Sequence, residues 1–334
     1  MKLIAETAWH HEGDFVFMRN LVSQISKNTN ADIIKMHITL NLDEYMDQNH
    51  ESYNNLKSML FSKKQWQELI SIVKDSKKEL MLLVNDSEAI KFAALHKPEF
   101  VELHSVCLNV PHLQNKVLKN FDKNTKIVIG VGGCTLDEVD NAVKFFQNKE
   151  TILMFGFQNY PTKYEDVNIA KIRKIQTLYS SKTFGYADHT GWDEVNNELI
   201  TLLVASNGMD YIEKHVTTNY GQKRCDFSAA ISTDMLNSLG KKIKILDQVY
   251  GNGITELNEG EKSYSQYGPM KMAALANSNL KQGDFISLKD IVFRRTKEKT
   301  DLSQVDLVNL IAKPLSRPIS KNEIFNWTHF TDIK

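Results

Sequence analysis

Cysteine is scarce in this sequence: Cys107, Cys134 and Cys225 are the only three, and none stands in a CxxC pair. Thiols this few and scattered exclude a disulfide framework and argue against a zinc ribbon, so a reducing compartment fits best. No stretch approaches the roughly 20 apolar residues that a membrane-spanning helix needs. The residues after Met1 also lack the apolar segment of a signal peptide. We therefore expect a cytoplasmic protein with no membrane partner.

Neither sign of charge is in excess, since lysine plus arginine and aspartate plus glutamate both number 41. A balanced chain has no overall field that would attract nucleic acid. We therefore expect no nucleic-acid partner, and an anionic substrate must be bound by local groups. The 334 residues leave room for a large and a small domain.

Short apolar runs rich in β-branched residues recur along the first part of the chain. Eight of them are predicted strands: Leu3–Ala5, Ile33–Ile38, Leu80–Asn85, Phe100–His104, Ile127–Val131, Ile152–Phe157, Phe184–Ala187 and Tyr211–Val216. Between them lie amphipathic helix candidates, among them Asp14–Ser26, Lys64–Ser76, Leu136–Gln147, Asn168–Ser180 and Trp192–Ala205. Apolar strands that alternate with helices indicate a parallel sheet covered on its faces. Eight such strands predict an α/β fold of the (β/α)₈ TIM barrel type, with a doubly wound sheet as the alternative.

The pattern changes after Ser228. Met235–Gly251 is predicted to form one more helix, and the polar residues 251–267 follow it as a linker. Short strand-like pieces then stand among turn residues: Met272–Ala276, Phe285–Ser287, Val292–Arg295 and Glu323–Phe325. We therefore expect a barrel at residues 1–250, a linker at 251–267 and a small β-rich domain at 268–334.

Two histidines follow consecutive predicted strands. In TIM barrels the active site lies at the C-terminal ends of the strands. His189 and His215 close two strands that would be neighbours in a barrel, so both imidazoles can face one ion. Two neutral histidine nitrogens with water and substrate oxygens suit Mn²⁺ or a similar divalent metal. The alternative is that each histidine only makes a hydrogen bond at a strand end.

Lys35 lies within the apolar segment Ile33–Ile38. A lysine in such a strand is expected to point its ammonium inward at an anion or a carboxylate, because a buried charge must be paired. The alternative is an ion pair with Glu6 or Glu213 and no catalytic duty.

Several longer motifs occur along the chain. They are AETAWHHEGD at Ala5–Asp14, IKMH at Ile34–His37, YPTKYEDVN at Tyr160–Asn168, GYADHT at Gly185–Thr190 and IEKHVT at Ile212–Thr217. Asp226 follows the last of them, and Leu280–Asp290 with Val292–Arg295 lies in the tail. In these motifs the chain resembles the bacterial sialic acid (N-acetylneuraminate) synthases with their pseudaminic and legionaminic acid relatives. The resemblance implies that the small C-terminal domain is an antifreeze-like (SAF) domain.

The resemblance also implies a reaction. Phosphoenolpyruvate and an N-acylated hexosamine, such as N-acetylmannosamine, would condense to a nonulosonic acid with release of phosphate. His189 and His215 would bind Mn²⁺ or Mg²⁺, which polarises the open-chain aldehyde. Glu6 would hold the sugar or a metal-bound water, Lys35 would pair with the substrate carboxylate, and Asp226 would hydrogen-bond the sugar hydroxyls.

Further residues are assigned to substrate binding by the same resemblance. Those in the barrel are Ser105, Gln158, Asn159, Tyr160 and Asp188, of which the first three are candidate phosphate donors. Arg295 falls where the tail domain of the family supplies an arginine to the N-acetyl group in a partner subunit's site. That position implies a domain-swapped homodimer.

Some family positions are altered near the expected phosphate. Glu102 stands where lysine is usual, Cys107 replaces a glutamate, and Ala187 replaces a serine. Repulsion between Glu102 and an anionic substrate would cost at least about 1 kcal/mol. Two alternatives to the synthase therefore stay open: a related metal-dependent aldolase or lyase that uses pyruvate, and a non-catalytic sugar-binding homologue.

Overall fold

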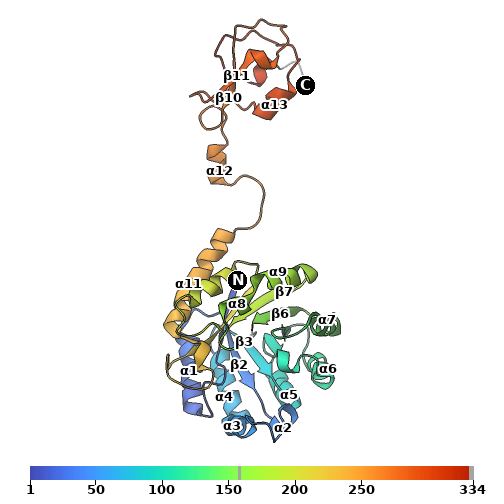
Figure 1. Cartoon of the computed structure of the whole chain (residues 1–334), viewed down its shortest axis with the longest axis vertical. Helices are drawn as coiled ribbons and strands as arrows, with labels where there is room; N and C mark the ends of the chain where they lie inside the picture. The colour runs from blue at the N-terminus through green and yellow to red at the C-terminus, as the bar shows by residue number, and fades with distance from the viewer. Residues whose placement is uncertain (157–158, 331–334) are drawn as a thin grey trace. The chain divides into compact units, whose positions relative to one another are not determined.

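The computed structural model describes residues 1–156 and 159–330. The chain divides into two compact units, Met1–Gly251 and Asn252–Lys334 (Figure 1). Among the described residues, no helix has both the length and the apolar character needed to cross a bilayer.

The first unit is a closed parallel barrel of eight strands. They are β1 (Lys2–Glu6), β2 (Ile33–Ile38), β3 (Glu79–Val84), β4 (Phe100–Leu103), β5 (Lys126–Gly130), β6 (Thr151–Gly156), β7 (Thr183–Asp188) and β8 (Tyr211–Thr217). Each strand pairs with the next along the chain, and β8 pairs with β1, so the sheet closes on itself. A short strand, β9 (Ala230–Ser232), adds to β8. The closure confirms the predicted TIM barrel and excludes the doubly wound sheet.

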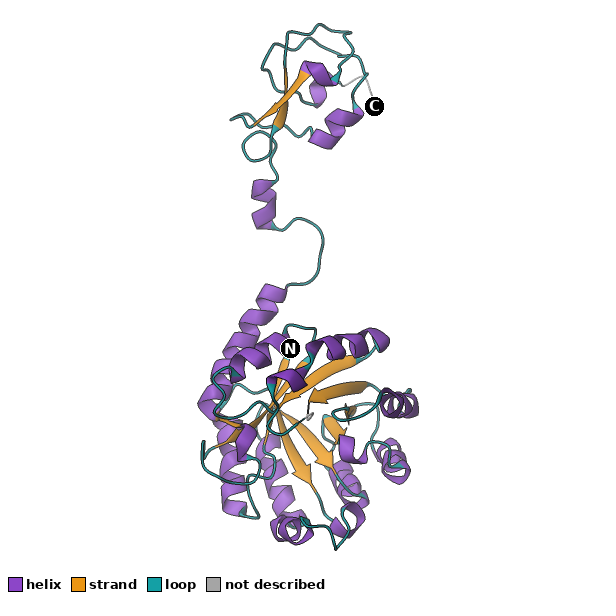
Figure 2. Cartoon of the chain, viewed as in Figure 1, coloured by secondary structure: helices purple, strands orange, loops and turns teal. Residues whose placement is uncertain are grey.

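Helices surround the strands, as Figure 2 shows in purple around orange. They are α1 (Phe15–Asn28), α2 (Leu42–Tyr45), α3 (Tyr53–Met59), α4 (Lys63–Lys74), α5 (Ser87–Leu95), α6 (Pro111–Asn120), α7 (Leu136–Phe145), α8 (Tyr164–Val167), α9 (Ile169–Leu178), α10 (Asn197–Ala205) and α11 (Thr233–Tyr250). Their starts follow local capping chemistry: the Asp14 side chain caps α1, and Thr135 forms a capping box with Glu138 at α7. Helix α10 begins at Asn197 rather than at the predicted Trp192, because a turn intervenes.

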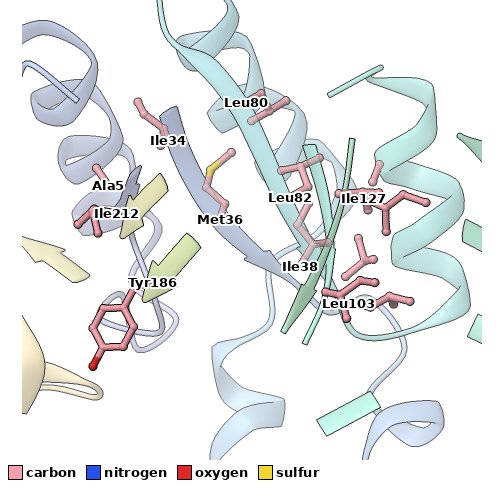
Figure 3. Close-up of a cluster of buried hydrophobic side chains, with 14 of the residues drawn as sticks. Ala5, Ile34, Met36, Ile38, Leu80, Leu82, Leu103, Ile127, Tyr186 and Ile212 are labelled. Atoms are coloured by element: carbon pink, nitrogen blue, oxygen red, sulfur yellow. The ribbon is translucent and has the colours of Figure 1, made fainter. Parts of the chain in front are cut away.

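Alternation along the strands sorts the buried side chains into two sets. One set faces the helices and includes Ala5, Ile34, Met36, Leu82 and Ile212 (Figure 3). The other set fills the inside of the barrel with Ile4, Ile33, Met81, Phe100, Val128, Ile152, Met154, Ala187 and Tyr211. Four of these strands carry a buried charged residue two positions further along: Glu6, Lys35, Glu102 and Glu213. An apolar layer therefore supports a charged layer nearer the C-terminal ends of the strands.

The second unit is small and has its own core. Its elements are α12 (Glu259–Tyr264), β10 (Ala273–Ala276), η3 (Leu288–Asp290), β11 (Ile291–Arg294), α13 (Gln304–Asn309) and η4 (Trp327–His329). Strands β10 and β11 pair antiparallel, and Phe325 is among the buried residues of the core. Helix α12 occupies part of the predicted linker. The antifreeze-like assignment of this unit stays a prediction.

Two of the strands predicted for the second unit do not form. Phe285 makes only a single bridge to Pro314, and Ile324 makes one to Leu275. The chain turns close to both segments, since Gly283 has a φ of +86° and Asn322 a φ of +66°. Both segments still exchange backbone hydrogen bonds with a neighbour, since the Phe325 N–H donates to Ala274 O and the Ile286 N–H donates to Lys313 O.

Candidate active site and metal centre

A cavity of about 370 Å³ lies among residues at the C-terminal ends of the barrel strands. Most of the residues predicted for the site line it: Glu6, Lys35, Ser105, Tyr160, His189, His215 and Asp226. They come from separate parts of the sequence, and strand closure brings them together. Glu6 ends β1, and its register partners are Lys35 on β2 and His215 on β8. Neighbouring strands thus present all three side chains at one level of the barrel.

Glu6, His189 and His215 form the candidate metal centre. Their metal-binding atoms lie within 4.8 Å of one another, and all three residues are buried. The two imidazole rings meet edge to face with their centroids 4.8 Å apart. Burial, followed by the nearby His215, holds the pKa of His189 well below its ordinary value, so that His189 is neutral. Two imidazole nitrogens and one carboxylate are a donor set that suits a first-row divalent metal with open positions for substrate.

Tyr160 sets which nitrogen of His215 is available. Its hydroxyl donates to the backbone oxygen of Asp226 at 2.5 Å and lies 3.4 Å from His215 Nδ1. Because the hydroxyl proton is already committed, the Tyr160 oxygen can only accept from His215 Nδ1, and from this we infer the tautomer with its proton on Nδ1. The lone pair is then on Nε2, which lies 3.4 Å from Glu6 Oε2. This tautomer turns an acceptor nitrogen toward a carboxylate, an arrangement that fits a bound cation.

Lys35 is engaged by three carboxyl groups. Its Nζ lies 2.8 Å from Glu102 Oε2, 2.9 Å from Glu213 Oε1 and 3.3 Å from Glu6 Oε2. All four side chains are buried. The structure thus shows the ion pairs with Glu6 and Glu213 that the sequence left as the alternative. It adds Glu102, whose carboxylate is compensated by Lys35 instead of standing alone.

The charges of this cluster depend on one another. Burial by itself would lower the pKa of Lys35, but Glu102, Glu213 and Glu6 raise it well above the ordinary value. Burial and then the charge of Glu6 raise the pKa of Glu213 well above its usual range. Burial also acts to raise the pKa of Glu6, yet Lys35 and a hydrogen bond from Glu213 hold it well below. We infer a charged Lys35, an ionised Glu6 and a protonated Glu213.

Three further residues of the cavity wall carry no role in the sequence-based predictions. His37 closes β2, and its Nε2 lies 2.9 Å from Glu6 Oε1. His104 follows β4, and burial, with His37 next, lowers its pKa to about 3. Both histidines stand at strand ends, so their position was the available signal. Trp9 lies in the loop after β1, where the sequence offers no comparable signal.

Asp188 is not among the residues that line the cavity, and its predicted role in substrate binding stays a prediction. The inward positions near the end of β7 are Ala187, which belongs to the inner core, and His189. Alternation turns Asp188, which lies between them, toward the helices. Its carboxylate accepts from Thr190 and Thr201 and lies 3.1 Å from Lys214 Nζ, all fully buried. Asp188 therefore ties β7 to β8 and α10 on the outer face of the sheet.

The other predicted residues lie elsewhere. Asn159 is exposed, donates to Asp166 and is not part of the cavity wall. Gln158 lies outside the described residues. Arg295 belongs to the second unit, where its guanidinium donates to the backbone oxygen of Pro269. Cys107 is buried, and burial raises the pKa of its thiol to about 12, so no thiolate forms near neutral pH.

The fold and the site define a TIM-barrel protein with a candidate metal centre at the C-terminal ends of its strands. The chain belongs to the NeuB family, whose model matches residues 22–255. This finding confirms the predicted family.

Among curated relatives, the N,N'-diacetyllegionaminic acid synthase of Legionella pneumophila is 24% identical, over 98% of this chain and 94% of that protein. The human N-acetylneuraminate-9-phosphate synthase is 21% identical, over 96% and 90%. Among solved structures, a putative spore coat polysaccharide biosynthesis protein E from Chromobacterium violaceum matches with a TM-score of 0.81 and 16% identity, over 98% and 99% of the two chains. These identities mark a divergent member of the family.

Proposed function

We propose that this chain is a metal-dependent nonulosonic acid synthase that joins phosphoenolpyruvate to the open-chain aldehyde of an N-acylated hexosamine. The observation that carries the proposal is the convergence of Glu6, His189 and His215 in a cavity that also contains Asp226. The relatives support the product class, because their names refer to legionaminic acid and N-acetylneuraminate 9-phosphate, which are both nonulosonic acids.

The residues of the cavity divide the proposed work. A divalent ion, Mn²⁺ or Mg²⁺, held by Glu6, His189 and His215 would supply Lewis-acid polarisation of the aldehyde. Tyr160 would keep His215 in the tautomer that leaves Nε2 for the ion. The Asp226 carboxylate would accept hydrogen bonds from the sugar hydroxyls, and the Ser105 hydroxyl would donate to the phosphate.

The test is release of inorganic phosphate from phosphoenolpyruvate with a panel of N-acyl hexosamines that includes N-acetylmannosamine. We expect release to require both substrates and Mn²⁺, and to stop in the His189→Ala variant. His112→Ala is the matched control, because His112 is exposed on α6 and outside the cavity wall. Silence across the whole panel from folded, Mn²⁺-loaded protein would contradict the proposal.

One observation favours a second candidate, a metal-dependent aldolase that uses pyruvate. Among the described residues that line the cavity, Lys35 is the only lysine or arginine, and three carboxyl groups already contact it. Phosphoenolpyruvate brings a carboxylate and a phosphate, whereas pyruvate brings a single negative charge. Even with Glu213 protonated, three other carboxyl groups and one ammonium line the cavity, a balance that disfavours the more highly charged donor.

Glu102→Lys separates the two candidates, and Glu102→Gln, which removes the charge without adding one, is its matched companion. A synthase hindered by repulsion should show a KM for phosphoenolpyruvate that falls by about tenfold in Glu102→Lys. A pyruvate-using aldolase should stay inactive with phosphoenolpyruvate in both variants and should form product from pyruvate in the wild type. If no variant shows either activity but the protein binds sugar tightly, the non-catalytic sugar-binding homologue is the remaining candidate.

We also propose that the enzyme works as a domain-swapped homodimer in which Arg295 of one subunit binds the N-acyl group in the site of the other. The support is the family resemblance of the tail. Mixing inactive His189→Ala protein with Arg295→Ala protein tests this, because a swapped dimer regenerates one site with both residues intact. Activity of the re-associated mixture should exceed that of either variant alone, and the absence of any gain would count against the swap.

A further inference from the structure

Two loops above the barrel strands are tied to each other by side chains outside the cavity wall. One is the β1 loop, residues 7–14, and the other is the β8 loop, residues 218–229. Arg224 of the β8 loop donates from Nε to His10 O at 2.6 Å and from Nη2 to His11 O at 3.2 Å. In return, Glu12 Oε1 of the β1 loop accepts from the backbone N–H of Cys225 at 2.7 Å. Each loop thus binds the backbone of the other through a charged side chain.

Further contacts of Arg224 and His10 stabilise this arrangement of the two loops. Arg224 Nη2 lies 3.5 Å from Glu12 Oε2, and the guanidinium carbon lies 4.1 Å from the centre of the Phe17 ring. His10 Nδ1 donates to the Cys225 backbone oxygen at 2.7 Å. Only arginine offers a rigid fork that can reach two carbonyl oxygens and also stack on an aromatic ring.

Residues next to these loop-to-loop hydrogen bonds in the chain line the cavity. Trp9 and Asp226 both line it, and the Trp9 backbone N–H donates to Asp226 Oδ2 at 2.9 Å. Asp226 has a φ of +59°, in the left-handed region that few residues other than glycine, asparagine and aspartate adopt. Its neighbours Arg224 and Cys225 tie this turn to the β1 loop, and the Tyr160 hydroxyl also donates to its backbone oxygen.

We propose that Arg224 and Glu12 are positioning residues for sugar recognition, which act by holding Asp226 and Trp9 at the wall of the cavity. Neither Arg224 nor Glu12 lines the cavity, so their effect passes through the loops. The inference rests on the proposed function for its ligand, a polyhydroxy N-acyl hexosamine. Its structural part does not, because the link between the loops exists without substrate.

The first experiment measures amide hydrogen exchange of the two loops in the full-length protein without substrate. Arg224→Met removes the fork but keeps an apolar chain over Phe17, and Glu12→Ala removes the acceptor for the Cys225 N–H. In either variant, exchange of residues 7–14 and 218–229 should rise by about tenfold or more. Arg19→Met is the matched control, because Arg19 pairs with Glu68 and is not part of the cavity wall. Exchange that stays at the wild-type rate in Arg224→Met would overturn the proposal.

The second experiment reads the consequence for the ligand. In Arg224→Met, the KM for N-acetylmannosamine, or its Kd by calorimetry with Mn²⁺ present, should rise by about tenfold. The values of kcat and of the KM for the three-carbon donor should stay within about threefold, and Arg224→Lys should recover part of the affinity. A wild-type sugar affinity beside increased loop exchange would overturn the positioning role. If the protein turns over no sugar but Arg224→Met still shows the increased amide exchange of the two loops, only the proposed function is contradicted.

Discussion

The two sides of the barrel cavity contain similar side chains but differ in what they leave for a ligand. On the side of the candidate metal centre, neutral His189 turns toward His215 and Glu6, and a cation placed among them would gain three donors. On the other side the cation is Lys35, and Glu102 and Glu213 already surround it. The candidate metal centre lacks the positive charge that a bound cation would supply. The positive charge of Lys35 is already neutralised by carboxyl groups of the chain.

This difference separates two properties that the family motifs present together. The motifs around His189 and His215 predict a metal that activates a sugar aldehyde. They say nothing about the group that binds the three-carbon donor. Glu102 contacts Lys35 at 2.8 Å, and Glu6 of the candidate metal centre lies 3.3 Å from the same ammonium. A change at position 102 therefore acts first on the side of Lys35 and reaches the metal side through Lys35 and Glu6.

The largest expected effect comes from removing the cation. Lys35→Met leaves the carboxylates of Glu6 and Glu102 buried without their ammonium partner, and should lower the free energy of unfolding by about 3–5 kcal/mol. Urea denaturation measures the loss. Because burial raises the pKa of Glu102 and of Glu213, the folded variant binds more protons than the unfolded chain. Its stability should therefore recover as the pH falls toward the ordinary glutamate range of about 4.3.

A second variant provides the control for that prediction. Adding Glu102→Gln to Lys35→Met removes one of the unpaired charges, so the double variant should regain part of the lost stability. A loss below about 1 kcal/mol in Lys35→Met alone would mean that the cluster is not held together by the ammonium.

Asp188 and Asp226 allow a matched comparison of an outer and an inner carboxylate. Asp188→Asn leaves the buried Lys214 without its carboxylate, and should lower the free energy of unfolding by about 3 kcal/mol. The folded fraction should keep its kcat/KM, because Asp188 faces away from the cavity. Asp226→Asn should do the reverse, with a KM for the sugar raised by about tenfold and a stability changed by less than about 1 kcal/mol. Equal kinetic losses in the two variants would show that the assignment to the two faces is wrong.

The last comparison concerns the pH dependence of stability. Burial, followed by nearby histidines, lowers the pKa of His10 to about 4 and that of His11 to about 3. Below about pH 6.5 the unfolded chain binds protons that the folded chain does not, so each histidine should cost about 1.4 kcal/mol per pH unit until its own pKa is reached. Urea denaturation at pH 7, 6 and 5 measures the slope. His11→Phe should reduce the slope by one proton, whereas His112→Phe, at an exposed position, should not change it. Equal slopes in the two variants would contradict the claim that His11 is buried and neutral.

Much of the fold could be predicted because the barrel strands are apolar and short. All eight strands were expected within a residue or two of their bounds, since each is a compact run between polar segments. The second unit was harder to predict. There Phe285 and Glu323–Phe325 have strand-like composition, but turns beside them leave only single bridges. Composition alone does not reveal how far a segment stays paired with its neighbour.

The site could be predicted where strands end and not where loops meet. His189 and His215 stand at the ends of neighbouring strands, so closure of the barrel was enough to predict that they converge. Glu6, which was expected to hold the sugar or a metal-bound water, joins them in the structure. Asp188 was expected in the same group, but strand alternation turns it to the outer face, because neighbouring side chains of a strand point in opposite directions. Arg224 was not predicted at all, because its partners lie more than 200 residues earlier in the chain, in a loop whose shape no periodicity reveals.

Binding of Mn²⁺ to the purified protein tests the central claim most directly. After treatment with a chelator, calorimetric titration should give one Mn²⁺ per chain, and the affinity should fall by about 100-fold or more in His189→Ala and in His215→Ala. His112→Ala should bind as the wild type does. A wild type that binds no Mn²⁺ or Mg²⁺, or an affinity that survives the loss of both cavity histidines, would contradict the metal centre on which the proposed function depends.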